Sequence, residues 1–259
     1  MFDFINFGFR ITQSRRDDII IAEKRNIRPK PRRGGIIIAT NFPKSLITKI
    51  KIMQLYLVTD ENACLGRDLF WVVEEAVKGG VTMVQLREKS LGTRAFIDRA
   101  KKMKDILLPY NVPLIINDRV DIALASDADG VHVGQSDMPY EMLKDLLPPE
   151  KIIGLSAETK EDVLEAENWD LTYLAVSPLF STPSKTDTLR PWGMDGLKWV
   201  KANSKHPLVV IGGLNETNTA EAISNGAEGI AIISAICSAI SPFEAARYLK
   251  FLINKIEKI

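Results

Sequence analysis

Cysteine and histidine are scarce in this chain of 259 residues. It has two cysteines, Cys64 and Cys237, and two histidines, His132 and His206. These residues are too few and too far apart in the sequence to predict a thiolate zinc site or a framework of disulfides. We therefore expect a protein of a reducing, cytoplasmic environment.

Long hydrophobic runs and a strong overall charge are also missing. The strongest apolar runs, such as residues 229–236, fall short of the roughly 18 residues that cross a bilayer. The composition is 46% hydrophobic and 26% charged, with a formal net charge of +1. These values exclude disordered, collagen-like and disulfide-rich classes, and they predict a soluble globular protein with a large apolar core and no membrane partner.

The small net charge hides a difference between residues 1–52 and 53–259. The first stretch has twelve Lys and Arg against four Asp and Glu, whereas the second has 22 against 29. We expect residues 1–52 to form a basic, poorly ordered extension in front of a single catalytic domain, residues 53–259. A nucleic-acid-binding arm, a targeting peptide and a tail without function compete as explanations. The tail is favoured, including the case in which Met53 is the true start, and no nucleic-acid partner is expected.

From Met53 onward, short apolar runs alternate with stretches that have helical periodicity. Runs such as residues 114–116 and 208–211 are almost unbroken, as is typical of parallel strands covered on both faces. The predicted strands are residues 55–59, 82–87, 113–117, 130–133, 152–155, 173–177, 208–211 and 229–233. The predicted helices are residues 69–78, 94–108, 121–126, 140–147, 160–168, 197–203, 219–225 and 242–258.

Eight strand and helix pairs of this length predict an α/β fold, a single (β/α)8 TIM barrel with an extra N-terminal extension. A doubly wound open sheet is the alternative. A dinucleotide-binding sheet would place G-x-G-x-x-G after its first strand, where this chain has Thr59-Asp60-Glu61-Asn62. The barrel is favoured, and its site is expected on the loops that follow the strands.

Charged side chains follow the second, third and fourth predicted strands. Arg87 and Lys89 lie two residues apart, so an extended chain turns both to one side, where they suit a phosphate or diphosphate. An ion-pair ladder with Glu88 explains them equally well. Asp118 and Asp137 follow the next two strands, and two carboxylates beside cations are a natural Mg2+ arrangement. For either aspartate alone, a helix N-cap is the favoured interpretation.

The later strands are followed by polar or glycine-rich loops. Residues 177–187 combine several hydroxyl groups with Lys185, which suits a flap that closes over an anion, although a solvated connection has the same composition. Gly212-Gly213 and residues 233–235 follow the last two strands, where barrels commonly bind phosphate through backbone N–H groups. His132 lies inside a strand and is expected to pack in the core.

Taken together, six motifs resemble the thiamine-phosphate synthase family. They are Gln85-Leu86-Arg87-Glu88-Lys89, Asn117-Asp118, residues 130–137, Thr182-Pro183-Ser184-Lys185, Ile211-Gly212-Gly213 and residues 233–236. Each motif alone is modestly specific, but all six occur in the family's order between about Leu55 and Ile236. Residues 1–52 have no counterpart in the family.

The resemblance implies a Mg2+-dependent transferase. The family joins 4-amino-2-methyl-5-hydroxymethylpyrimidine diphosphate to a thiazole phosphate, and it releases diphosphate and forms thiamine phosphate. Diphosphate departure would leave a pyrimidine cation, which the thiazole nitrogen attacks, so charge stabilisation of the leaving group would dominate catalysis.

The resemblance also implies a role for each matching residue. The pyrimidine diphosphate would be held by Gln85, Leu86, Arg87, Glu88, Lys89, Asn117, Ser156 and Lys185. The thiazole phosphate would be held by Thr182, Pro183, Ser184, Gly213, Ile233 and Ser234. Asp118 and Asp137 would bind Mg2+, and Arg87, Lys89 and Lys185 would be the catalytic cations.

Three positions depart from the family pattern. Ser177 stands where glycine is usual, Ser184 where threonine is usual, and Glu158 where many relatives have histidine. Thiazole tautomerases resemble this family in fold and use a histidine in that region, so Glu158 and the two retained aspartates count against a tautomerase. A non-catalytic barrel that binds a phosphate ligand is the other alternative. The sequence leaves a homo-oligomer and the preferred form of the thiazole acceptor open.

Overall fold

The computed structural model describes residues 9–11, 22–24, 51–182 and 190–256. The chain forms two compact units, Met1–Asn41 and Phe42–Ile259. In the first unit, β1 (Phe9–Ile11) pairs antiparallel with β2 (Ala22–Lys24). The sequence analysis did not predict these strands. The domain boundary after residue 52 and the role of the extension stay predictions.

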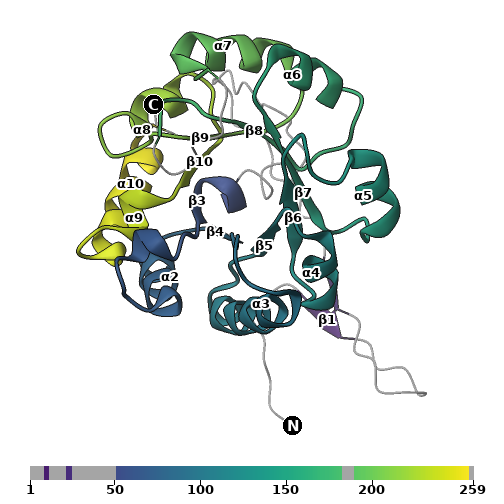
Figure 1. Cartoon of the computed structure of the whole chain (residues 1–259), viewed down its shortest axis with the longest axis vertical. Helices are drawn as coiled ribbons and strands as arrows, with labels where there is room; N and C mark the ends of the chain where they lie inside the picture. The colour runs from purple at the N-terminus through teal and green to yellow at the C-terminus, as the bar shows by residue number, and fades with distance from the viewer. Residues whose placement is uncertain (1–8, 12–21, 25–50, 183–189, 257–259) are drawn as a thin grey trace. The chain divides into compact units, whose positions relative to one another are not determined.

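Eight parallel strands close into a barrel in the second unit (Figure 1). They are β3 (Leu55–Val58), β4 (Met83–Leu86), β5 (Leu114–Asn117), β6 (Gly130–Val133), β7 (Ile152–Ala157), β8 (Tyr173–Val176), β9 (Leu208–Ile211) and β10 (Gly229–Ile232). Consecutive strands pair with each other, and β10 pairs with β3, with Ile230 opposite Leu55, so the sheet has no edge. This closure confirms the predicted (β/α)8 barrel and excludes the open sheet.

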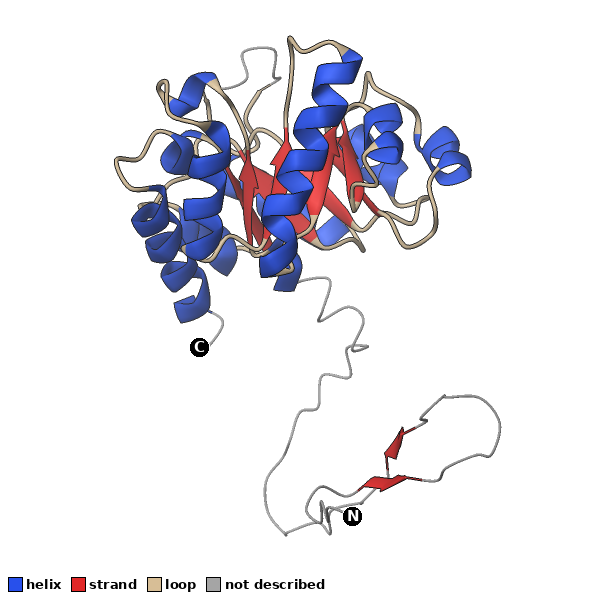
Figure 2. Ribbon diagram, turned by 90° about the horizontal axis from the view of Figure 1, so that it is seen from below, coloured by secondary structure: helices blue, strands red, loops and turns tan. Residues whose placement is uncertain are grey.

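Helices follow the strands and surround the barrel (Figure 2). They are α2 (Leu69–Lys78), α3 (Thr93–Leu107), α4 (Val120–Ala125), α5 (Tyr140–Leu146), α6 (Lys160–Ala166), α7 (Gly193–Asn203), α8 (Thr219–Ser224), α9 (Ser234–Cys237) and α10 (Pro242–Ile256). The eight predicted helices are present, and the short α9 is an addition. Two 3-10 turns, Asn62–Cys64 and Leu108–Tyr110, complete the connections. No helix in the described part of the chain is long and apolar enough to span a membrane.

Side chains of the strands alternate between two apolar cores. In β3, Leu55 and Leu57 face the surrounding helices, whereas Tyr56 and Val58 belong to a smaller cluster inside the barrel. This alternation follows from the period of two in an extended strand. It also decides which residue types can reach the cavity at the end of the barrel.

A charged cluster joins helix α3 to the two connections that precede β6 and β7. The Asp127 carboxylate lies 2.7 Å from Lys104 Nζ of α3 and 2.7 Å from Lys151 Nζ. Hydrogen bonds from the two lysines lower the pKa of Asp127 to about 2. Because the cluster precedes the strands, it lies away from the loops that follow them, and it is expected to act on stability alone.

We expect Asp127→Asn to destabilise the chain at neutral pH. The folded-state pKa of Asp127 lies below its ordinary value of 3.8, so the carboxylate stabilises the fold above pH 3.8, and this contribution is lost as the pH falls through about 2. Asparagine tolerates the backbone here, which has a φ of 50°. Urea unfolding across this range should show a difference from wild type that shrinks in acid. Asp145→Asn, at an exposed position of α5, is the control, and a pH-independent difference would contradict the assignment.

Candidate active site

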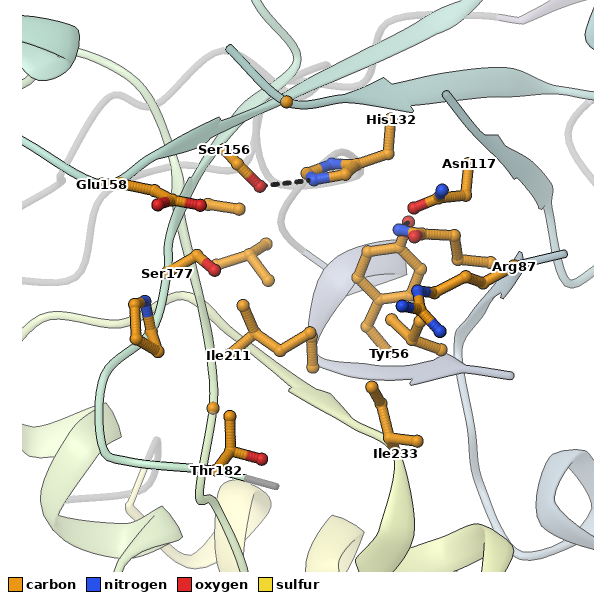
Figure 3. Close-up of a pocket in the computed structure, with 18 of the residues that line it drawn as sticks. Tyr56, Arg87, Asn117, His132, Ser156, Glu158, Ser177, Thr182, Ile211 and Ile233 are labelled. Atoms are coloured by element: carbon orange, nitrogen blue, oxygen red, sulfur yellow. Dashed lines mark hydrogen bonds between the residues drawn. The ribbon is translucent and has the colours of Figure 1, made fainter. Parts of the chain in front are cut away.

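A cavity of about 410 Å³ lies at the carboxyl ends of the barrel strands (Figure 3). Each of the eight strands contributes lining residues. Side chains from neighbouring strands, including Asn117, His132 and Ser156, are directed toward the same space. The cavity is therefore where the loops singled out by the sequence converge.

Most of the residues assigned to the site from the sequence line this cavity. They are Gln85, Arg87, Lys89, Asn117, Asp118, Asp137, Ser156, Thr182, Gly213, Ile233 and Ser234. Pro183, Ser184 and Lys185 lie outside the described residues, as does most of the predicted flap. The roles given to all of these residues stay predictions.

Two predicted site residues turn their side chains away from the cavity. Leu86 is completely buried in the core between the sheet and the helices. The side chain of Glu88 is 5% exposed and forms an ion pair with Arg99 of α3. The structure therefore does not bring these two side chains to the site, because they alternate with Gln85, Arg87 and Lys89 along the chain.

The two cations of the rim are each paired with a carboxylate. Arg87 Nη1 lies 3.4 Å from Asp60 Oδ2, and its side chain is 20% exposed. Lys89 Nζ lies 2.9 Å from Asp118 Oδ2, and its side chain is 59% exposed. The alternative ladder with Glu88 is not formed, since Glu88 pairs with Arg99 instead. Both cations line the cavity, and each already has a carboxylate partner there.

Asp118 and Asp137 line the same cavity and are close enough for the Asp118 carboxylate to raise the pKa of Asp137. Asp118 has a left-handed φ of 61°, and its N–H donates to the carbonyl oxygen of His132 at 2.8 Å. Asp137 Oδ2 accepts a 2.7 Å hydrogen bond from the N–H of Gly134, which closes a tight turn. Burial, together with the neighbouring Asp118 carboxylate, raises the pKa of Asp137. The pair is therefore poised to gain from a nearby positive charge.

The N-cap interpretation of these aspartates was wrong. The N-cap residues of α4 and α5 are Arg119 and Pro139, and neither helix has a side-chain cap. Helix α4 begins one residue later, and α5 two residues later, than that interpretation required. Neither carboxylate is therefore engaged as a helix cap.

Two adjacent carboxylates suit a divalent cation that takes its remaining ligands from water and a bound substrate. No group of three or more His, Cys, Asp or Glu side chains suited to a metal occurs in the described ranges. A cation between Asp118 and Asp137 would therefore complete its shell with water and ligand oxygens. Mg2+ binds proteins in this way, whereas structural zinc needs four protein ligands.

A chain of hydrogen bonds crosses the floor of the cavity. Gln85 Nε2 donates to Tyr56 Oη at 2.7 Å, and Tyr56 Oη lies 3.0 Å from Tyr173 Oη. Tyr173 Oη lies 2.9 Å from His132 Nδ1, and His132 Nε2 lies 2.9 Å from Ser156 Oγ. Burial raises the pKa of both tyrosines, so their hydroxyls keep their protons.

The sequence analysis missed most of this floor network, which we define as Gln85, Tyr56, Tyr173, His132 and Ser156. His132 is buried as expected, but it also lines the cavity. The two tyrosines were treated as ordinary strand residues. Their inward register, with Tyr56 two residues before the end of β3 and Tyr173 at the start of β8, was the signal that could have found them.

The opposite side of the cavity is built from backbone. Gly212 and Gly213 have φ values of 105° and 65°, which favour glycine. A Cβ on Gly213 would lie 2.8 Å from the Cβ of Phe180, so the chain comes close there. Ile233 and Ser234 at the start of α9 line the same region. Backbone N–H groups thus gather where an anionic group could approach.

Comparison with known proteins gives consistent matches over the barrel. The family model described as thiamine monophosphate synthase matches residues 55–236. The thiamine-phosphate synthase of Albidiferax ferrireducens is 51% identical over 208 residues, which is 80% of this chain and 95% of that protein. The thiamine-phosphate synthase of Vibrio campbellii is 52% identical over 196 residues, 76% of this chain and 96% of that protein.

Solved structures show the same likeness. Thiamine phosphate pyrophosphorylase from Pyrococcus furiosus superposes with a TM-score of 0.73 at 35% identity, covering 80% of this chain and 98% of that one. A 3-hexulose-6-phosphate synthase has a TM-score of 0.57 at 16% identity, with 77% and 99% covered. The second similarity concerns the fold alone.

We expect the rim to bind inorganic diphosphate chiefly through Arg87. Arg87→Met should weaken binding about tenfold or more, because a partly buried, charge-assisted hydrogen bond is lost. Lys89→Met should cost less than about fivefold, since the more exposed ammonium is screened by water and salt. Isothermal titration of the two variants with diphosphate provides the comparison. Equal losses, or a larger loss for Lys89→Met, would contradict this ranking.

Proposed function

The chain belongs to the thiamine monophosphate synthase family, and on that premise we propose how its residues carry out the transfer. A thiamine-phosphate synthase is a transferase that joins a pyrimidine diphosphate to a thiazole phosphate. The observation that supports the assignment of roles is the meeting of two cations and two facing carboxylates at the rim of one cavity.

The diphosphate end of the substrate is assigned to the rim and its ring to the floor. Arg87 and Lys89 bind the diphosphate oxygens, and Lys185 joins them on the strength of its motif. Gln85, Asn117 and Ser156 line the deeper part of the cavity, where a heterocycle can be hydrogen-bonded. The main chain of Leu86 and Glu88 supports this segment, because their side chains lie elsewhere.

The thiazole phosphate is assigned to the glycine side of the cavity. Gly213, Ile233 and Ser234 offer backbone N–H groups there, and Thr182 adds a side chain to the lining. Pro183 and Ser184 belong to the same motif. Binding both substrates in one cavity brings the nucleophile and the carbon together, which removes much of the entropic cost of the reaction.

Mg2+ is assigned to Asp118 and Asp137. The support is their mutual contact and the raised pKa of Asp137, which a cation would reverse. When bound, Mg2+ supplies positive charge beside the departing diphosphate. Lys89 then exchanges its pairing with Asp118 for one with the substrate, because both residues of this ion pair line the same cavity.

In the transfer itself, the carbon–oxygen bond to diphosphate breaks, and the electron pair leaves with the diphosphate oxygen. Arg87 and Lys89 stabilise the charge that develops there. The thiazole nitrogen then donates its lone pair to the pyrimidine methylene carbon. No base is needed, because the attacking nitrogen carries no proton. Apolar residues of the lining, such as Val209, Ile211 and Ala231, keep water from the pyrimidine cation.

We also propose a cytoplasmic location. The supporting observation is that Cys64 and Cys237 are buried free thiols that lie within hydrogen-bonding contact of each other. Adjacent thiols persist in reducing compartments and tend to become disulfides in oxidising ones.

The activity is tested by incubating the full chain with the pyrimidine diphosphate, the thiazole phosphate and Mg2+. We expect thiamine phosphate and diphosphate in equal amounts. A parallel sample with a thiazole tautomer alone tests isomerase activity. Conversion in that sample without any thiamine phosphate in the first would overturn the assignment.

Asp118→Asn should raise the Mg2+ concentration required for half-maximal turnover. We expect at least a tenfold increase, roughly the loss that outer-shell changes already cause at metal sites, with partial recovery in excess Mg2+. Asp121→Asn, three residues away and paired with Arg119, is the matched control. An unchanged Mg2+ dependence of Asp118→Asn would remove the aspartate from the metal site.

A further inference from the structure

We propose that Tyr173 is a positioning residue that, through His132, makes the Ser156 hydroxyl a hydrogen-bond donor and so selects a ligand with an unprotonated ring nitrogen. The inference rests on the proposed function, because it concerns how the same cavity recognises its heterocycle. The supporting observation is the direction of the hydrogen bonds in the floor network. Figure 3 shows the one between His132 and Ser156.

The direction starts at Gln85, whose Nε2 can only donate. Tyr56 Oη accepts this hydrogen bond, and we infer that its own hydrogen is then directed to Tyr173 Oη, 3.0 Å away. Tyr173 in turn directs its hydrogen to His132 Nδ1 at 2.9 Å. Each hydroxyl accepts once and donates once, and no fully buried side-chain nitrogen or oxygen in the described residues lacks a partner.

The direction assigns the tautomer of His132. Because Nδ1 accepts, the ring proton lies on Nε2, which donates to Ser156 Oγ at 2.9 Å. Ser156 lines the cavity, and its oxygen already accepts, so its hydrogen is directed to the ligand. A ring nitrogen with a lone pair satisfies this donor, whereas a C–H group leaves it without an acceptor.

The barrel is built to place the Tyr173 hydroxyl. A Cβ on Gly154 of β7 would lie 2.1 Å from Cζ and 2.3 Å from Oη of Tyr173. The Tyr173 ring stacks on His132 with centroids 5.6 Å apart and an interplanar angle of 12°. Glycine on the adjacent strand therefore provides the space that brings the phenol to the imidazole.

The tautomer can be observed directly by 15N NMR of the full chain labelled at histidine. The chain has two histidines, and His206 is an internal reference because its Nε2 lies 2.9 Å from the carbonyl oxygen of Ala166. We expect His132 to carry its proton on Nε2 in the wild type. In Tyr173→Phe, the Nδ1 resonance should move and the Nδ1-protonated tautomer should appear, with His206 unchanged. A proton on Nδ1 in the wild type, or unchanged His132 resonances in the variant, would overturn the proposal.

Kinetics test the consequence for recognition. Tyr173→Phe should raise KM for the pyrimidine diphosphate about five- to tenfold, the effect of one hydrogen bond, and leave KM for the thiazole phosphate unchanged. Tyr140→Phe is the matched control, because Tyr140 is a buried tyrosine of α5 whose hydroxyl accepts from the N–H of Asp170 outside the cavity. It should leave both KM values unchanged. Equal rises for both substrates in Tyr173→Phe would indicate a merely structural role and overturn the proposal.

Two analogues of the pyrimidine diphosphate, each with one ring nitrogen replaced by C–H, complete the test. The wild type should bind one of them about tenfold more weakly than the parent, and Tyr173→Phe should lose this discrimination. Gly154→Ala, if it folds, should act like Tyr173→Phe, because it displaces the hydroxyl without changing a polar group.

The inference and the proposed function fail in different ways. Absence of thiamine phosphate with the wild type would overturn the proposed function. The NMR experiment would still determine the tautomer of His132. Normal product formation with undiminished discrimination in Tyr173→Phe would overturn the inference alone.

Discussion

A polar side chain that enters a closed barrel must find its hydrogen-bond partner inside, because the sheet and the helices around it exclude water. An unpaired buried donor or acceptor costs about 1–3 kcal/mol. Tyr56 and Tyr173 turn inward by strand register, and each satisfies the other. The floor is therefore a single network in which a change at one hydroxyl alters the hydrogen bonding of the next, and this gives the cavity a defined polarity before any ligand binds.

At the rim, charged side chains likewise need partners, because a partly buried charge is costly when it is unpaired. Arg87 is paired with Asp60, and Lys89 with Asp118, so each cation has a counter-ion without a ligand. In the proposed function, a diphosphate and a divalent cation bind together and exchange these pairs for new ones, so that each rim charge keeps a partner of opposite sign. Binding either alone would leave some charge uncompensated in a partly buried site, which is unfavourable. With the roles proposed above, the rim would thus favour a metal–diphosphate complex over its separate parts.

The barrel was predictable because parallel strands covered on both faces need continuous apolar runs, which the sequence shows plainly. The site was predictable only where its residues lie in loops that follow strands. Leu86 and Glu88 were included because the motif was read as a block, although strand alternation already turned them outward. Tyr56 and Tyr173 could not be found by composition, since a tyrosine in a strand is equally typical of the core. The left-handed backbone at Asp118 likewise accompanies a contact with the neighbouring strand, because its N–H donates to the carbonyl oxygen of His132.

The side of the cavity that Gly212, Gly213 and α9 form depends on a residue that lies far from it in the sequence. Helix α9 spans only Ser234–Cys237, too short to be stable through its own hydrogen bonds. Arg67 donates to the carbonyl oxygens of Cys237 at 2.5 Å and Ala239 at 2.6 Å, and also to that of Cys64 at 3.0 Å. A cation at this end satisfies carbonyls that α9 leaves unpaired and opposes its dipole. The N-terminal end of α9 presents Ser234 to the cavity. Arg67, which holds the C-terminal end of the same helix, therefore helps to fix the position of the backbone N–H groups there.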